Sequence, residues 1–148
     1  MPTKSQNVAQ YILWLAREAS VTPMQLLKLA YIAHGWMLGI HGKPLLVENA
    51  EAWKYGPVIP SIYHSYKKFG GNPITELPKT EPEGLSEEEK DLIRQVWGIY
   101  GKYTGLQLSA LTHKPDTPWD TTRRLVGLGA TISNDLIEDH YHSLAAKA

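Results

Sequence analysis

The side chains with the greatest chemical potential in this sequence are six histidines, and they are scattered along the chain. Two pairs come closest to a shared site: His34 with His41, and His140 with His142. The first pair is separated by seven positions across a glycine-ended helix, and the second pair points to different faces, so no zinc pattern emerges. We predict no metal-binding residue and no cofactor.

Catalysis would need a nucleophile or a tuned acid or base. The chain has no cysteine, no Gly-x-Ser-x-Gly elbow and no glycine-rich phosphate loop. His113 and Asp116 can form an acid–base pair, but a role in a helix cap and turn explains them as well. We therefore predict no catalytic residue. A small hydrolase or transferase that uses His113 or His34 as its base is kept as an alternative.

Residues 51–69 carry a stronger signal, because their pattern changes from strand to turn to helix. Trp53 and Tyr55 alternate with a small and a charged residue, which is the period of a half-buried strand. The glycine and proline that follow bend the chain. Such a bend presents a large aromatic side chain and the cation Lys54 where backbone groups are free to meet a partner. In the other interpretation both aromatics pack against a neighbouring helix and Lys54 is only solvated.

The elements that must position this segment are mostly helical. Apolar periodicity and capping residues predict helices at residues 5–19, 23–40, 61–69, 86–103 and 104–113, a helical turn from Pro118, and a last helix from Ser133. The helix at 23–40 is apolar around most of its circumference and must be central, with Lys28 among its few water-facing side chains. Gly35 and Gly39 extend the stripe of Lys28, which indicates that another element approaches that face closely. For His34, a core histidine bonded to a carbonyl or hydroxyl is favoured over a ligand role.

Only one region favours a sheet, since residues 45–47 can form a short strand that pairs with residues 50–55. Residues 72–84 hold three prolines and three glutamates, which predicts a solvated connection within one domain. The expected fold is therefore mostly α. It is a compact single-domain helical bundle over residues 1–148, around a central buried helix at 23–40, with a two-stranded β-hairpin near 45–55.

Composition limits the partners that the chain can have. The 148 residues are enough to bury a core, and Lys plus Arg equal Asp plus Glu at 15 each, so no overall basic field favours nucleic acid. Residues 1–80 hold eight cations against four anions and residues 81–148 hold seven against eleven, which gives halves of +4 and −4. These halves either neutralise each other in the fold or form two docking faces. The absence of cysteine and of a long apolar run predicts a cytoplasmic protein with no membrane anchor.

Five motifs, taken in order and spacing, resemble the Panacea antitoxin domain family, which has SocA-like antitoxin members and phage-associated GepA-like members. The motifs are LLKLAYIAHGW at residues 26–36, GKPL at 42–45, EAWKYGPVIPSIY at 51–63, LSALTH at 108–113 and PW at 118–119. They extend over nearly the whole chain.

The resemblance implies a mostly helical domain that binds a cognate toxin directly and neutralises it, with different members pairing with unrelated toxins. It also implies that some members act as adaptors that present the toxin to a cytoplasmic AAA+ protease. Many antitoxins add a DNA-binding domain, for which we expect no spare length here. A phage-associated protein with no toxin partner remains an alternative, and the sequence leaves open whether the chain forms a homo-oligomer.

The residues and the resemblance together predict one partner-binding surface, centred on the strand that leads into the turn. An interaction surface needs preorganised aromatic side chains and a few cations, and no reactive group. The candidates are Trp53, Lys54, Tyr55, Gly56, Pro57, Tyr63, His113 and Trp119. The last two form a second patch, which either packs beside the first or completes the core, with the core favoured. Burial of Trp53 would count against this prediction.

Overall fold

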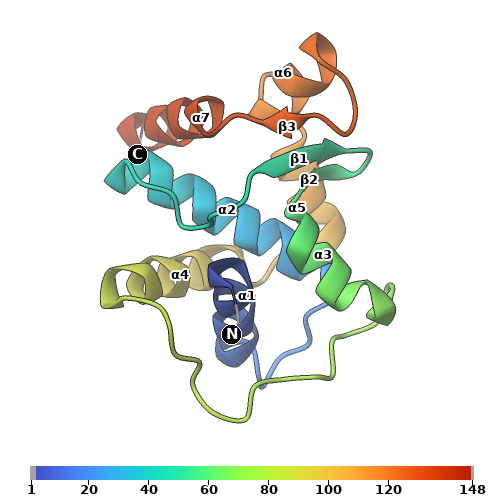
Figure 1. Ribbon diagram of the computed structural model, residues 1–148, viewed down its shortest axis with the longest axis vertical. Coiled ribbons are helices and arrows are strands. Elements are labelled where there is room, and N and C mark those ends of the chain that lie inside the picture. The colour runs from blue at the N-terminus through green and yellow to red at the C-terminus, as the bar shows by residue number, and fades with distance from the viewer. Residues whose placement is uncertain (1–2, 148) are drawn as a thin grey trace.

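The structure is a computed structural model that describes residues 3–147, and in it the chain is mostly helical with one small sheet, as predicted (Figure 1). The α-helices are α1 Lys4–Leu15, α2 Pro23–His41, α3 Pro60–Tyr66, α4 Glu87–Tyr100, α5 Gly105–Thr112, α6 Pro118–Leu125 and α7 Asn134–Lys147. A 3-10 helix, η1 Lys67–Phe69, continues α3, and the strands are β1 Ala50–Trp53, β2 Gly56–Val58 and β3 Thr131–Ile132.

Local capping chemistry sets most of the helix starts. Capping boxes form at the starts of α2, α4 and α5, where Thr22, Ser86 and Thr104 each accept a hydrogen bond from the backbone N–H three residues on. The first helix is shorter than expected and ends at Leu15, because residues 17–20 are exposed and gain no packing from further helix. Within residues 3–147, no helix has both the length and the apolar character that a membrane crossing requires.

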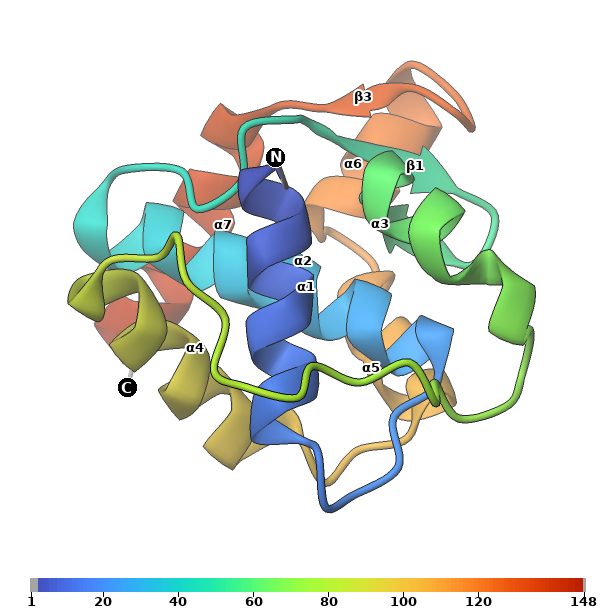
Figure 2. The same cartoon turned by 60° about the horizontal axis from the view of Figure 1, so that its bottom comes forward.

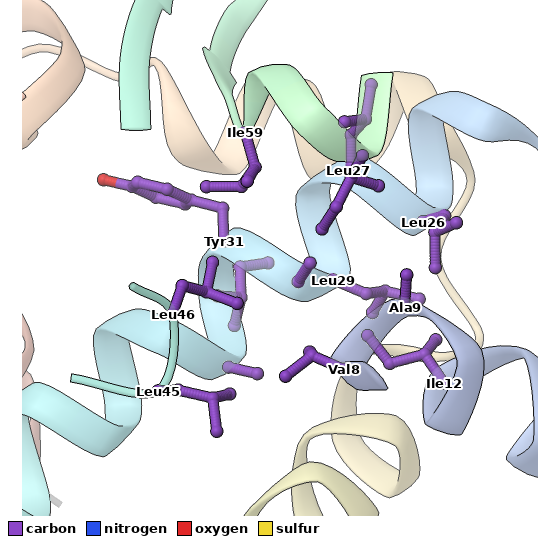
Figure 3. Packing of buried hydrophobic residues seen from close by; sticks show 14 of the residues in the cluster. Val8, Ala9, Ile12, Leu26, Leu27, Leu29, Tyr31, Leu45, Leu46 and Ile59 are labelled. Atoms are coloured by element: carbon purple, nitrogen blue, oxygen red, sulfur yellow. The ribbon is translucent and has the colours of Figure 1, made fainter. Parts of the chain in front are cut away.

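Helix α2 is the central element, as its apolar sequence predicts. Helices α1, α4, α5 and α7 all lie against it, and Figure 2 shows α1 crossing over it. Figure 3 shows Val8 and Ile12 of α1 beside the α2 side chains, with Leu26 and Leu29 in the same fully buried cluster. Burying one such aliphatic side chain stabilises the fold by roughly 1.5–3 kcal/mol, so the α1–α2 contact is a main part of the core.

The close approach predicted for the glycine stripe of α2 is confirmed, and the approaching element is α7. A Cβ atom built on Gly39 would lie 2.7 Å from the backbone carbonyl carbon of Tyr141, and one on Gly35 would overlap the Tyr141 ring. The buried Tyr141 ring also packs edge-on against Trp36, with centroids 5.1 Å apart. Only glycine allows the two helices to lie this close together.

The sheet differs from the expected hairpin in its strand pairing. Residues 45–47 form no strand; instead β1 pairs in antiparallel fashion with β2 on one side and with β3 on the other. The turn between β1 and β2 is tight because Gly56 adopts a φ of 118°. The backbone N–H groups of Leu45 and Leu46 are used elsewhere, since both donate to Nδ1 of His34 at 3.2 and 3.1 Å.

Candidate partner-binding site

The tip of the β1–β2 hairpin presents the exposed part of the predicted surface. The side chain of Tyr55 is 63% exposed, and the Nζ atom of Lys54 lies 5.5 Å from the centroid of its ring. Gly56 and Pro57 are buried just behind them in β2. The hairpin therefore projects one large aromatic side chain and one cation from a backbone fixed by strand pairing.

Trp53 lies at the base of the tip and is half-buried, an outcome between the two interpretations that the sequence left open. Its ring meets Tyr63 of α3 edge to face, with centroids 4.9 Å apart. Its indole N–H donates to Oε1 of Glu51 at 2.8 Å. Both contacts fix the ring orientation, so one side of the indole is held ready at the surface.

A pocket of about 440 Å³ opens between this hairpin, the start of α2 and helix α3. We call it the hairpin pocket. It is lined by Pro23, Met24, Leu27, Lys28, Trp53, Lys54, Tyr55, Val58, Tyr63, Lys67 and Gly70. Four of the eight predicted contact residues line it, namely Trp53, Lys54, Tyr55 and Tyr63. Its walls are aromatic and aliphatic, which suits a site for a protein side chain.

A larger hollow of about 590 Å³ lies between α1, α3 and the connection that precedes α4. Its lining is mainly polar, with Gln6, Asn7 and Gln10 from α1 facing Glu81 and Glu83. None of the predicted contact residues lines it. The hairpin pocket is therefore the better candidate site.

The prediction that the Lys28 side chain faces water is wrong. The residue is 2% exposed and its Nζ atom donates to the backbone carbonyl of Pro57 at 2.9 Å. Burial lowers the pKa of Lys28 to about 7, and no carboxylate within residues 3–147 offsets that effect. The buried Lys28 amine thus ties the central helix to strand β2 at the wall of the hairpin pocket.

The sequence contained a signal for this burial. Lys28 stands on the same helical stripe as Gly35 and Gly39, the face that was expected to meet another element closely. Helix α7 covers the glycine end of that stripe, and the hairpin covers the lysine end. A long lysine side chain in the middle of an apolar helix is usually assumed to reach solvent, and here the hairpin prevents it.

The second predicted patch lies behind the hairpin. Trp119 is 7% exposed, and its indole N–H donates to the backbone carbonyl of Trp53 at 2.7 Å. The ring of His113 packs on Trp119 with centroids 5.2 Å apart, and its Nδ1 lies 3.3 Å from Oγ of Ser109. Ser109 in turn donates to the backbone carbonyl of Tyr55 at 2.5 Å. These residues of α5 and α6, with His113 beside them, hold the hairpin backbone in place from its buried side.

The acid–base pair considered for His113 and Asp116 is not formed. Asp116 adopts a positive φ of 66°, and its carboxylate lies 3.6 Å from the guanidinium of Arg124. The His113 ring instead faces Ser109 and Trp119. The cap-and-turn interpretation therefore describes both residues.

His34, the other histidine considered as a base, is fully buried. Its Nδ1 accepts the two N–H groups of Leu45 and Leu46, so its Nε2 carries the hydrogen and donates to Oδ1 of Asn134 at 3.0 Å. Burial lowers the pKa of His34 below its ordinary value, although the Asn134 bond acts in the other direction. This is a core histidine bonded to a carbonyl oxygen, that of the Asn134 side chain, as expected, and its second nitrogen also orders the segment after α2 by accepting two backbone amides.

Comparisons with known proteins show the family to which the chain belongs. The family described as "Antitoxin SocA-like, Panacea domain" matches residues 26–120, which contain most of α2, the hairpin, α3, α4, α5 and the start of α6. Antitoxin SocA from Caulobacter vibrioides (strain NA1000 / CB15N) is 31% identical over 140 residues, which cover 85% of this chain and 74% of the relative. Among solved structures there is no significant match. The chain belongs to the SocA-like antitoxin family with a Panacea domain.

Proposed function

We propose that this protein neutralises a cognate toxin by binding it directly through the hairpin tip and the hairpin pocket. The observation that carries the proposal is the exposed Tyr55 standing beside an apolar pocket whose backbone frame is fixed from behind by Trp119 and Ser109. Rigid aromatic anchors next to a pocket are the usual centre of a protein interface. A preorganised frame lowers the entropy lost on binding.

The eight predicted residues take different roles in this proposal. Lys54 and Tyr55 contact the toxin, and Trp53 and Tyr63 form the pocket wall. The buried residues hold these four in position; they are Gly56, Pro57 and Trp119, with the half-buried His113 beside them. Lys28 is added as a further positioning residue, because its bond to the Pro57 carbonyl holds β2 against α2.

The experiment that tests the proposal is affinity capture of the tagged protein from its native host, with the partner identified by mass spectrometry. We expect one stoichiometric small protein that is toxic when expressed alone and harmless when co-expressed with this chain. Substitution of Tyr55 by alanine should abolish the protection while the purified variant stays folded. Full protection by a folded Tyr55→Ala variant would rule out the hairpin tip as the contact.

The second part of the proposal is that the protein delivers the toxin to an AAA+ protease. Such an adaptor must bind the protease through a surface that is separate from the toxin site. The end of α6 offers one, since its last residue Leu125 and the following Val126 are both 76% exposed and line no part of the hairpin pocket. The test is toxin half-life in cells. Replacing both residues by serine should lengthen the half-life without weakening toxin binding, and an unchanged half-life would leave direct binding as the mechanism.

A further inference from the structure

The hairpin pocket has an uneven charge, with cations and no anion in its lining. Three lysines line it, Lys28 from α2, Lys54 from the hairpin tip and Lys67 from η1, and its lining holds no Asp or Glu. None of the three forms an ion pair within residues 3–147, whereas Lys4, Lys43, Lys68 and Lys90 all do. The carboxylate nearest in sequence to the tip, Glu51, accepts the indole N–H of Trp53.

The three lysines have weak partners inside the molecule. Lys28 donates to one backbone carbonyl, Lys54 lies over the Tyr55 ring, and Lys67 lies 3.3 Å from Nδ1 of His64. A buried cation without a counter-ion is costly, as the pKa of about 7 for Lys28 reflects. A carboxylate that reaches the pocket would remove that cost on binding.

The walls determine what must accompany such a carboxylate. Met24, Leu27 and Val58 give an aliphatic side, and the rings of Trp53, Tyr55 and Tyr63 give an aromatic one. An inorganic anion would leave these walls unfilled. An apolar side chain flanked by acidic residues would fill the walls and meet the lysines together.

We propose that the hairpin pocket takes an acidic segment of the toxin, in which an aromatic or aliphatic side chain packs against the contacting rings of Trp53 and Tyr63 and flanking Asp or Glu carboxylates meet Lys28, Lys54 and Lys67. This inference rests on the proposed function, and it adds the chemistry of the partner. Charge complementarity of this kind mainly raises the association rate and selects the partner.

Capped synthetic peptides test the pocket without the toxin. The acidic probe is acetyl-Leu-Glu-Trp-Glu-Leu-amide, and its matched control replaces both Glu by Gln. Binding is followed by NMR from the Trp53 indole N–H and the backbone N–H groups of residues 54–56 and 58. We expect the acidic probe to bind at least ten-fold more tightly than the control, and the difference to shrink as salt is raised.

Variants of the protein identify the lysines responsible. Lys54→Glu and Lys67→Glu change exposed side chains, and each should remove most of the ten-fold preference. Lys147→Glu, at the end of α7 and outside the pocket lining, should leave the preference intact. Lys28→Met should lower the affinity for the acidic probe to that for its control, and the two exposed variants decide the matter if Lys28→Met does not fold.

Equal affinity for the acidic and neutral probes, or shifts confined to residues outside the pocket, would overturn the inference. A third probe, the neutral peptide with a free carboxyl terminus, would overturn the choice of an acidic segment if it alone bound tightly. Measurements with the captured toxin keep the two proposals apart. If Tyr55→Ala loses the toxin and the lysine variants retain it at the wild-type rate, direct binding stands and the acidic segment is wrong; if Tyr55→Ala retains it, the proposed site itself is wrong.

Discussion

The indole N–H of Trp119 donates a hydrogen bond of 2.7 Å to the backbone carbonyl of Trp53, and so joins α6 to strand β1 across 66 residues of sequence. This hydrogen bond explains how the buried Trp119 and the half-buried Trp53 can belong to the same candidate site. Trp119 fixes the backbone of strand β1 at Trp53, and the Trp53 side chain forms part of the wall of the hairpin pocket.

Trp119→Phe should therefore weaken both the fold and the site. The change leaves the part-buried Trp53 carbonyl without this donor, which costs about 1–3 kcal/mol in the free energy of unfolding, measured by urea titration. Toxin affinity should fall as well, although the Trp119 side chain is buried. Trp97→Phe, at a half-buried tryptophan of α4, is the matched control and should leave toxin affinity unchanged. Equal effects of the two substitutions on affinity would contradict a positioning role for Trp119.

Tyr55→Ala should separate binding from stability, because the side chain is mostly exposed. We expect a loss of ~2 kcal/mol or more in toxin binding, measured by calorimetry, and a melting temperature close to that of the unmodified chain. Trp53→Ala should instead reduce both quantities, since it also removes the contact with Tyr63. A stability loss from Tyr55→Ala as large as that from Trp53→Ala would show that the tip is part of the core.

Lys28 should make stability depend on pH in the alkaline range. Its pKa is about 7 in the folded chain and near 10.5 in the unfolded one, so between these values the unfolded chain binds the extra proton. The free energy of unfolding should rise with pH above 7, with a contribution of up to roughly 1.4 kcal/mol per pH unit. Urea titrations from pH 7 to 9 measure this slope. Lys28→Met should flatten it, and an unchanged slope in that variant would assign it to another group.

His34 should also make the free energy of unfolding rise with pH, but in the acid range. Burial lowers its folded-state pKa, so the unfolded chain takes up the proton first and stability falls as pH drops below about 6.5. His34→Leu should remove that dependence and also leave the Leu45 and Leu46 amides without an acceptor, at a cost of about 3 kcal/mol or more. His64→Gln, at an exposed histidine of α3, should change neither quantity.

The glycines of α2 and α4 should respond in opposite directions to alanine. Gly39→Ala should lower the free energy of unfolding by about 2 kcal/mol or more, because the new Cβ would lie 2.7 Å from the Tyr141 backbone. Gly98→Ala, in α4 with open space around it, should raise it by roughly 0.5–1 kcal/mol. Thermal unfolding of the two variants measures both effects. A neutral Gly39→Ala would mean that α7 can move away from α2.

What the sequence alone determined rests on interactions between near neighbours. Thr22 and Gln25 satisfy each other three residues apart, so the start of α2 can be read directly from the chain. The same holds for the apolar circumference of α2, the tight turn at Gly56 and the family motifs at 26–36 and 51–63. These features predicted a mostly helical fold with one central helix, and they made the hairpin the candidate site.

The tertiary structure decided which distant groups meet. Lys28 donates to the carbonyl of Pro57, 29 residues further along the chain. His34 accepts the amides of Leu45 and Leu46, so these amides are not free to pair in the strand expected at 45–47. Strand β1 pairs instead with β2 and β3. A sequence pattern shows that a side chain is polar, but whether it reaches water depends on the element that covers it. The hairpin pocket and the burial of Lys28 could not be predicted for this reason, because both depend on how α2, the hairpin and α3 pack together.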